Sequence, residues 1–523
     1  MVSCAHDRSK RRFQLQLRLW HIARSVVSNW FATGATLAAG FFLAPFVVHH
    51  LGNVAYGVWV LAISSVNYLT LLDLGMRSSV LRFVSKGHTQ EDHKGASEII
   101  SAALWVRLMI SALVLLLSGV LAALFPILFK VPADLAKDAR EAILVIGVTT
   151  AIGMSLGVLG GILSALNRYD LQSYVALIQL AVRVGGVVAV LLAGHGIVAI
   201  AFCELAAAVV GNVLLAIIAR KIYPELEIRL KKPKMDILRK IWSYSVYAFL
   251  ITVAIQLVYQ TDNLVVGAFV SATAVTFYSI GNSLCRYTDQ VVGSMTMTFV
   301  PAASTYEAAG DLTSLRSLYY NGTRATMAIS LPILVTLLVR GHSFIGLWMG
   351  PQYSHTSGTV LVILAAALVF SLSNNPAGAI AYGTEKHKTI AKWAIGEAIT
   401  NLSLSMVLAH YIGIYGVALG TLIPSLFVHV ILWPRYVSKM VDVTTFEVYW
   451  KVWGPMFVTV TPFAVASYVV NVVAPAHNIA IFFLQTLALL PIFFGMGALV
   501  FRDAVKRQIL PRVRSLFLQL QSR

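Results

Sequence analysis

The chain has 523 residues, of which 58% are hydrophobic and 12% are charged, and its formal net charge is +18. Soluble globular chains have roughly 45–50% apolar and about 25% charged residues. This composition therefore excludes a soluble enzyme, a disordered protein and a coiled coil. Cys4, Cys203 and Cys285 form neither a disulfide framework nor a zinc-binding spacing. The sequence predicts a polytopic membrane protein.

About fourteen apolar segments are long enough to cross the hydrocarbon core of a bilayer, which takes about 20 helical residues. They lie near residues 22–48, 54–76, 98–124, 142–165, 171–193, 197–219, 243–269, 273–300, 324–349, 358–381, 391–411, 414–433, 452–473 and 479–501. Long continuous runs of this kind are typical of membrane helices and not of alternating β-strands. We therefore expect an all-α fold with about fourteen transmembrane helices.

Basic residues are concentrated in alternate connecting segments. The expected external loops carry only Lys130, Lys137, Arg140 and Arg340, whereas both tails and the segment 220–242 are strongly basic. Cytoplasmic loops are enriched in Lys and Arg, so we expect both termini in the cytoplasm and an even number of spans. Topology and contact with anionic lipids account for the positive charge, and no nucleic-acid partner is expected.

The polar segment 220–242 divides the chain into related halves. The expected parts are a basic tail at 1–21, a six-helix bundle at 22–219, the linker 220–242, a second six-helix bundle at 243–433, an accessory helix pair at 434–501 and a basic tail at 502–523. Gly196 and Gly413 each open a span after a tight external turn, at equivalent places in the two bundles. Such repeats place the substrate pathway between the two halves.

The sequence contains neither a nucleotide-binding GxxxxGK[ST] loop nor an HExxH zinc motif. An ATP-driven pump and a zinc hydrolase are therefore not expected. A secondary transporter remains, with no catalytic residues, no metal site and no bound cofactor, driven by a gradient of H⁺ or Na⁺.

Charged side chains inside the expected spans are the sharpest functional signal, because they are costly there and usually face a cavity or a partner. Arginine binds phosphate and carboxylate groups through two parallel hydrogen bonds, which suits an anionic substrate such as a diphosphate. The arginines expected to bind substrate are Arg107, Arg183, Arg286 and Arg324. The acidic residues expected to couple transport to an ion gradient are Asp262, Asp289, Glu204 and Glu397.

Two of these assignments have structural alternatives. Arg286 and Asp289 are three residues apart and can pair on one helix face. Arg324 lies near the cytoplasmic end of its span and can extend toward the membrane surface.

Three segments resemble one transporter family. Residues 51–86 begin with LGNVAYGVW and continue through LDLG to a basic run; the other segments are YQTDN at 259–263 and GIYGVALG at 413–420. They are similar to the polysaccharide transporter family, the Wzx-type oligosaccharide flippases of the multidrug/oligosaccharidyl-lipid/polysaccharide (MOP) superfamily. The resemblance implies a MATE-like fold with two six-helix bundles and a C-terminal helix pair.

The resemblance also implies a function. An undecaprenyl-diphosphate-linked oligosaccharide would be moved across the bacterial inner membrane by alternating access, for O-antigen, capsule or exopolysaccharide. Membrane lipids, a polysaccharide polymerase and a chain-length regulator are the implied partners. The family's cationic cavity and ion coupling match in type the four arginines and Asp262.

Three other functions stay open. A cation-coupled multidrug exporter and a MurJ-like lipid II flippase would share the fold. A membrane glycosyltransferase or polymerase would need larger polar loops than this chain provides.

Overall fold

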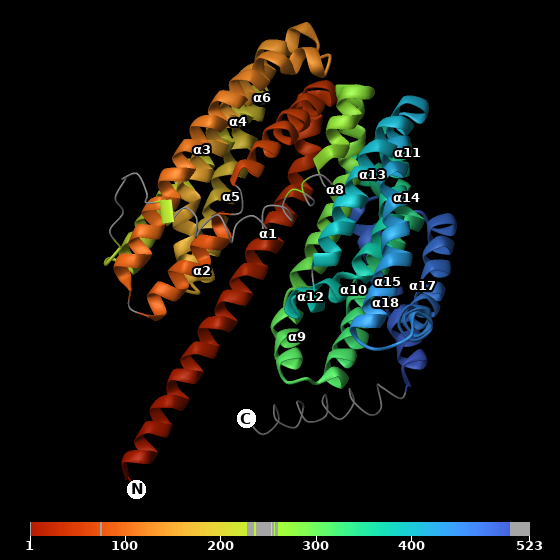
Figure 1. Ribbon diagram of the computed structural model, residues 1–523. Helices are drawn as coiled ribbons and strands as arrows, with labels where there is room; N and C mark the ends of the chain where they lie inside the picture. Colours follow the sequence, from red (N-terminus) through yellow and green to blue (C-terminus); the bar gives the residue numbers. More distant parts are fainter. Residues whose placement is uncertain are drawn as a thin grey trace. The chain divides into compact units, whose positions relative to one another are not determined.

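The computed structural model describes residues 2–73, 76–90, 92–226, 235–236, 253, 256, 260–386 and 388–502. Within these residues every regular element is helical (Figure 1). Ten helical segments of this described part are long and apolar enough to cross a membrane. The expected all-α membrane fold is confirmed.

The first two expected spans lie in one long helical segment, Val27–Asp73. Helix α1 (Val2–Leu69) is broken inside this segment at Gly52, where φ is 76° and ψ is 167°. Only glycine adopts this region of backbone conformation readily. Gly52, the first glycine of the LGNVAYGVW segment, therefore makes the turn that separates two spans.

Two further helices of 25 residues, α8 (Ala272–Thr296) and α13 (Lys388–Ile412), fall at the eighth and eleventh expected spans and have more polar sequences. The seventh expected span is helical over 260–269, and most of its earlier part lies outside the described residues. Together with the ten segments, these helices agree with about fourteen spans. Most of the expected linker 220–242, the tail 503–523, and Leu74 and Gly75 of the LDLG segment also lie outside the described residues.

The chain divides into two compact units, Met1–Thr276 and Phe277–Arg523. The N-terminal unit contains α1, η1 (Thr70–Asp73), α2 (Met76–Thr89), α3 (His93–Leu128), α4 (Ala133–Ala165), α5 (Tyr169–Leu192) and α6 (Ile197–Ile222). Val80, Ile100 and Ile162 belong to the buried core that α2, α3 and α4 share. Ser111 of α3 donates a hydrogen bond to the Ala151 carbonyl of α4 at 2.9 Å, so these two helices approach closely through small residues.

The C-terminal unit begins within α8. Its further elements are α9 (Phe299–Ala308), α10 (Leu312–Met349), α11 (Pro351–Ser373), α12 (Asn375–Gly383), α13, α14 (Ile414–Leu426), η2 (Phe427–Leu432), α15 (Trp433–Met440), α16 (Thr445–Glu447), η3 (Val448–Trp453), α17 (Gly454–Val473) and α18 (Ile479–Val500). Gly413 has φ of 59° and precedes α14, as Gly196 precedes α6, so the two expected helix starts are confirmed.

Two π-helical turns, η2 and η3, interrupt the late helices of the C-terminal unit. Two side chains from outside η2 donate to its carbonyl groups. Asn374 donates to the His429 carbonyl at 2.9 Å, and the Tyr449 hydroxyl donates to the Val430 carbonyl at 2.5 Å. Backbone polar groups away from water need such partners. Both contacts therefore hold η2 in its π-helical form.

Candidate functional site

Arg107 lies within α3 and is only 3% exposed. Its Nη2 is 2.6 Å from Oδ1 of Asp73 in η1, and its Nη1 donates to the Met154 carbonyl of α4 at 3.0 Å. The guanidinium thus joins three elements of the N-terminal unit. A substrate phosphate would have to replace one of these partners before it could bind Arg107.

Arg183 of α5 and Glu204 of α6 form a looser pair. Nε of Arg183 is 3.9 Å from Oε1 of Glu204, and the two side chains are 35% and 32% exposed. Exposed ion pairs contribute about 0–1 kcal/mol to stability. The sequence assigned these residues to substrate binding and ion coupling separately, and the structure brings them together.

Asp262 lies in a buried polar patch and is 5% exposed. On one side of it, Thr261 is hydrogen-bonded to the Tyr68 hydroxyl of α1. On the other side, the Asn263 amide donates to Oγ of Ser64 at 3.2 Å. Residues 261–263 of the YQTDN segment therefore have the buried polar partners that such a patch requires.

Arg286 and Asp289 lie on α8 in the C-terminal unit. The Arg286 side chain is exposed, and it makes no ion pair or hydrogen bond within the part of the chain that the structure describes. Asp289 is half-buried one turn further on, close to the buried thiol of Cys285. Of the four arginines expected to bind substrate, Arg286 alone makes no ion pair or hydrogen bond within the described residues.

Arg324 of α10 has partners in later elements. Its Nη2 donates to the Lys451 carbonyl of η3 at 2.7 Å, and its guanidinium lies 5.0 Å from the centre of the Phe501 ring. These contacts connect α10 to the π-helical turn and to the end of α18. Arg324 therefore supports the fold locally, and substrate binding by it stays a prediction.

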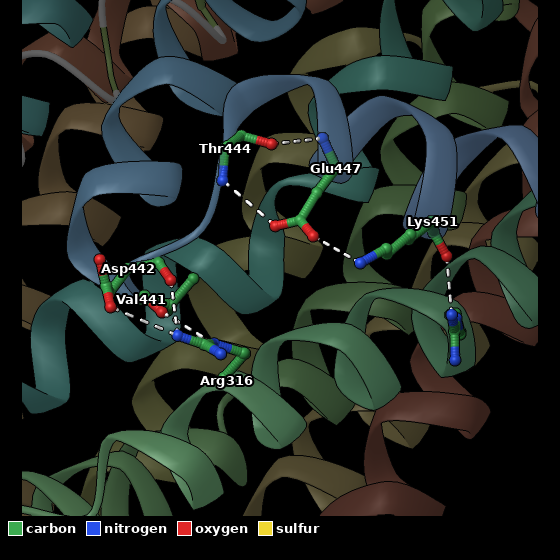
Figure 2. A network of polar contacts seen from close by, with 7 residues as sticks. Arg316, Val441, Asp442, Thr444, Glu447 and Lys451 are labelled. Carbon is green, nitrogen blue, oxygen red and sulfur yellow. Dashed lines mark hydrogen bonds and ion pairs between the residues drawn. The ribbon is translucent and has the colours of Figure 1, made fainter.

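Figure 2 shows the polar network beside this contact. Arg316 donates to the backbone carbonyl of Asp442 and lies 3.5 Å from its carboxylate. Thr444 and Glu447 form a capping box at the start of α16, and Glu447 also pairs with Lys451 one turn later. The network of exposed charges fixes the segment between α15 and η3, which includes α16.

Glu397 of α13 has a partner that the sequence analysis missed. Its Oε1 is 3.7 Å from Nε2 of His429 in η2, and the two side chains are 13% and 15% exposed. The sequence contains one signal for this pair, since Trp393 lies one turn before Glu397 and Trp433 lies one turn after His429. In the structure the rings of the two tryptophans are 6.5 Å apart.

The expected position of Arg340 is corrected. The charge count assigned it to an external loop, but it lies inside α10, within the expected span 324–349, and is 1% exposed. Its Nη2 donates to Gln485 of α18, and its guanidinium lies 4.3 Å from the centre of the Phe482 ring. The loop assignment was wrong because an amide acceptor and an aromatic ring contact this guanidinium inside the protein.

The eight expected site residues thus occupy several places within the two units. Among the described residues, no group of three or more His, Cys, Asp and Glu side chains could hold a metal ion. Arg107, Arg183 and Glu397 form ion pairs within their own units, whereas Arg324 has backbone and aromatic contacts and Arg286 is exposed.

Two solved structures share this fold. The lipid II flippase MurJ in an inward closed conformation aligns with a TM-score of 0.73 and 14% identity, covering 92% of this chain and 99% of that one. An inward-facing MATE multidrug resistance transporter aligns with a TM-score of 0.61 and 15% identity, covering 80% and 95%. The chain therefore has the fold that these two transporter structures share.

The chain belongs to the polysaccharide biosynthesis protein family, whose model matches residues 22–307. One relative is the uncharacterized membrane protein EpsK of Bacillus subtilis (strain 168), 25% identical over 402 residues that cover 76% of this chain and 79% of EpsK. Another is the probable low-salt glycan biosynthesis flippase Agl15 of Haloferax volcanii, 22% identical over 426 residues that cover 81% and 84%. The resemblance seen in the sequence is confirmed.

Proposed function

We propose that this protein is a flippase for undecaprenyl-diphosphate-linked oligosaccharides in the bacterial inner membrane. The observation that carries the proposal is the family match over residues 22–307, on a chain whose fold is that of MOP transporters. The units moved would serve surface or exported polysaccharide. Both termini would lie in the cytoplasm, as the distribution of basic residues indicates.

The physical task suits such a fold. A diphosphate and its sugars cannot enter hydrocarbon unaided, because unpaired charges and polar groups there are very costly. Alternating access of two helical units would shield the head group while the polyprenyl tail stays in lipid. No covalent bond changes, so the task needs neither a catalytic residue nor a bound cofactor. We propose a gradient of H⁺ or Na⁺ as the driving force.

A MurJ-like lipid II flippase is the second candidate, and the alignment with MurJ over 92% of this chain favours it. A multidrug exporter has less support, because the MATE structure covers 80% of the chain. The name of the Agl15 relative points to glycan biosynthesis, which favours the oligosaccharide function over both.

Deleting the gene in its host tests the proposal directly. We expect surface polysaccharide to be lost and the lipid-linked oligosaccharide to accumulate in the inner leaflet, because its synthesis continues without export. The measurement is extraction of polyprenyl-linked sugars sorted by leaflet. Accumulation of lipid II instead would support the second candidate. New sensitivity to cationic dyes without accumulation would support the drug exporter.

Arg286→Ala tests substrate binding at the exposed arginine. A charge-assisted hydrogen bond contributes about 1.5–3 kcal/mol, so we expect transport to fall roughly 10- to 100-fold. The protein level should be unchanged, because Arg286 has no partner within the described chain. Arg286→Lys should restore only part of the transport, because the planar fork is lost. Unchanged surface polysaccharide in Arg286→Ala would exclude this role.

A further inference from the structure

Glu397 and His429 face each other from two helical elements of the C-terminal unit. The two side chains lie 3.7 Å apart at Oε1 and Nε2 and are almost buried. One helical turn away, the Trp393 and Trp433 rings form an edge-to-face contact, and the His429 ring also stacks on Trp433 at an interplanar angle of 9°. The acid and the imidazole thus lie one turn beyond a pair of large aromatic rings.

The backbone of His429 is held firmly. It belongs to the π-helical turn η2, and its carbonyl accepts a hydrogen bond from the Asn374 amide at 2.9 Å. Its Nδ1 is buried and has no hydrogen-bond partner within the described residues. π-helical turns occur frequently at functional sites. A buried imidazole with one free nitrogen and one carboxylate neighbour is chemically equipped to take up or release a proton.

The net charge of the pair decides its preferred state. Without a bound proton the pair carries one negative charge, and with two protons it carries one positive charge. Burial in surroundings of low polarity disfavours both. The state with one shared proton is neutral overall, so this environment selects it.

Other ionisable side chains on the neighbouring elements are exposed or form hydrogen bonds elsewhere. Lys392 of α13 and Arg435 of α15 are exposed. The Tyr436 hydroxyl donates to the Lys386 carbonyl, and the Tyr449 hydroxyl donates to the Val430 carbonyl. Within the described residues Glu397 and His429 are therefore each other's ionisable partners.

We propose that Glu397 and His429 form a proton-binding pair, and that this pair couples transport to a proton gradient. The second half of the proposal rests on the proposed transport function. A proton would bind from water at either residue and be shared between Oε1 of Glu397 and Nε2 of His429, which a small side-chain rotation brings into hydrogen-bond distance. Hard cations such as Na⁺ prefer oxygen ligands, so an imidazole nitrogen in the pair favours a proton.

The sign of the pH effect follows from the charges. In an unfolded chain Glu and His release their protons at about pH 4.3 and 6.5. Above about pH 6.5 the folded protein would bind one proton more than the unfolded chain, until the pair itself is deprotonated. Stability therefore falls as pH rises through this interval.

The test compares thermal unfolding of the purified full-length protein in lipid nanodiscs at pH 6 and pH 9. We expect the midpoint of the wild type to fall by a few degrees more than that of the double variant Glu397→Gln/His429→Gln. The infrared spectrum should contain a protonated carboxyl band that depends on pH and disappears in Glu397→Gln. Equal pH dependence in wild type and double variant, or a band unaffected by Glu397→Gln, would overturn the proton-binding pair.

Matched controls come from the same region. Glu385→Gln and His410→Gln remove an exposed acid and an exposed imidazole and should retain the wild-type pH dependence. In cells lacking the chromosomal gene, Glu397→Gln should reach normal protein levels without restoring surface polysaccharide. Full restoration by Glu397→Gln would overturn the coupling role. If deleting the gene leaves surface polysaccharide intact, the proposed transport function is wrong. Thermal unfolding and infrared spectra of the purified protein would still decide whether the pair binds a proton.

Discussion

Arg107→Ala is expected to lower the free energy of unfolding by about 3–5 kcal/mol, because removing one member of a buried ion pair strands the other. The guanidinium lies 2.6 Å from the Asp73 carboxylate and donates to the Met154 carbonyl. The variant therefore removes a contact from the carboxylate and from the carbonyl at once. The Asp73 side chain is 25% exposed, which places the expected loss at the lower end of the range. Thermal unfolding and the amount of monodisperse protein would measure the effect.

The controls separate stability from substrate binding. Arg107→Met combined with Asp73→Leu should recover much of the stability, since apolar replacements of a buried pair are often tolerated. Arg183→Ala should cost less than about 1 kcal/mol, because its pair is a third exposed. Normal stability of Arg107→Ala with loss of polysaccharide would show that Arg107 acts on substrate instead.

Gly416→Val is expected to prevent α14 from packing against α13. A Cβ atom at Gly416 would lie 2.2 Å from the Leu408 carbonyl oxygen and 2.4 Å from its carbon. Overpacking costs about 1–3 kcal/mol where side chains can move, and backbone atoms move less easily. We therefore expect the variant to be destabilised by at least about 1–3 kcal/mol. The measurement is the amount of folded protein recovered from membranes, which should fall.

Gly396→Ala, on α13 itself, is the matched control for this close contact. A Cβ atom at Gly396 meets nothing within 4 Å, so the variant should fold as the wild type does. Equal recovery of Gly416→Val and Gly396→Ala would contradict the close approach of α13 and α14.

Hydropathy alone predicts much of the fold. Long apolar runs locate the helices, and Gly52 and Gly413 mark turns that require left-handed backbone conformations. Glycines of the GIYGVALG segment also indicate close packing, because small residues let membrane helices approach.

The partners of the charged residues could not be predicted, because pairing depends on which helix faces meet. The tryptophans one turn from Glu397 and from His429 do not by themselves indicate that these two residues pair, because the contact requires α13 and η2 to lie side by side. Arg340 was misplaced for another reason. The count of basic residues treated it as a loop residue, whereas Gln485 of α18 and the Phe482 ring contact it inside the protein.

The π-helical turn η2 has a consequence for the helix that follows it. A π turn contains one residue more than an α turn, and each α-helical residue accounts for about 100° of rotation. The faces of α14 and α15 are therefore out of phase by about that angle, although the two helices continue one another along the chain. A sequence one residue shorter in this turn would restore the common phase and direct a different side of α15 toward α13. When relatives are compared, the buried faces of α14 and α15 should therefore be assigned separately for each helix.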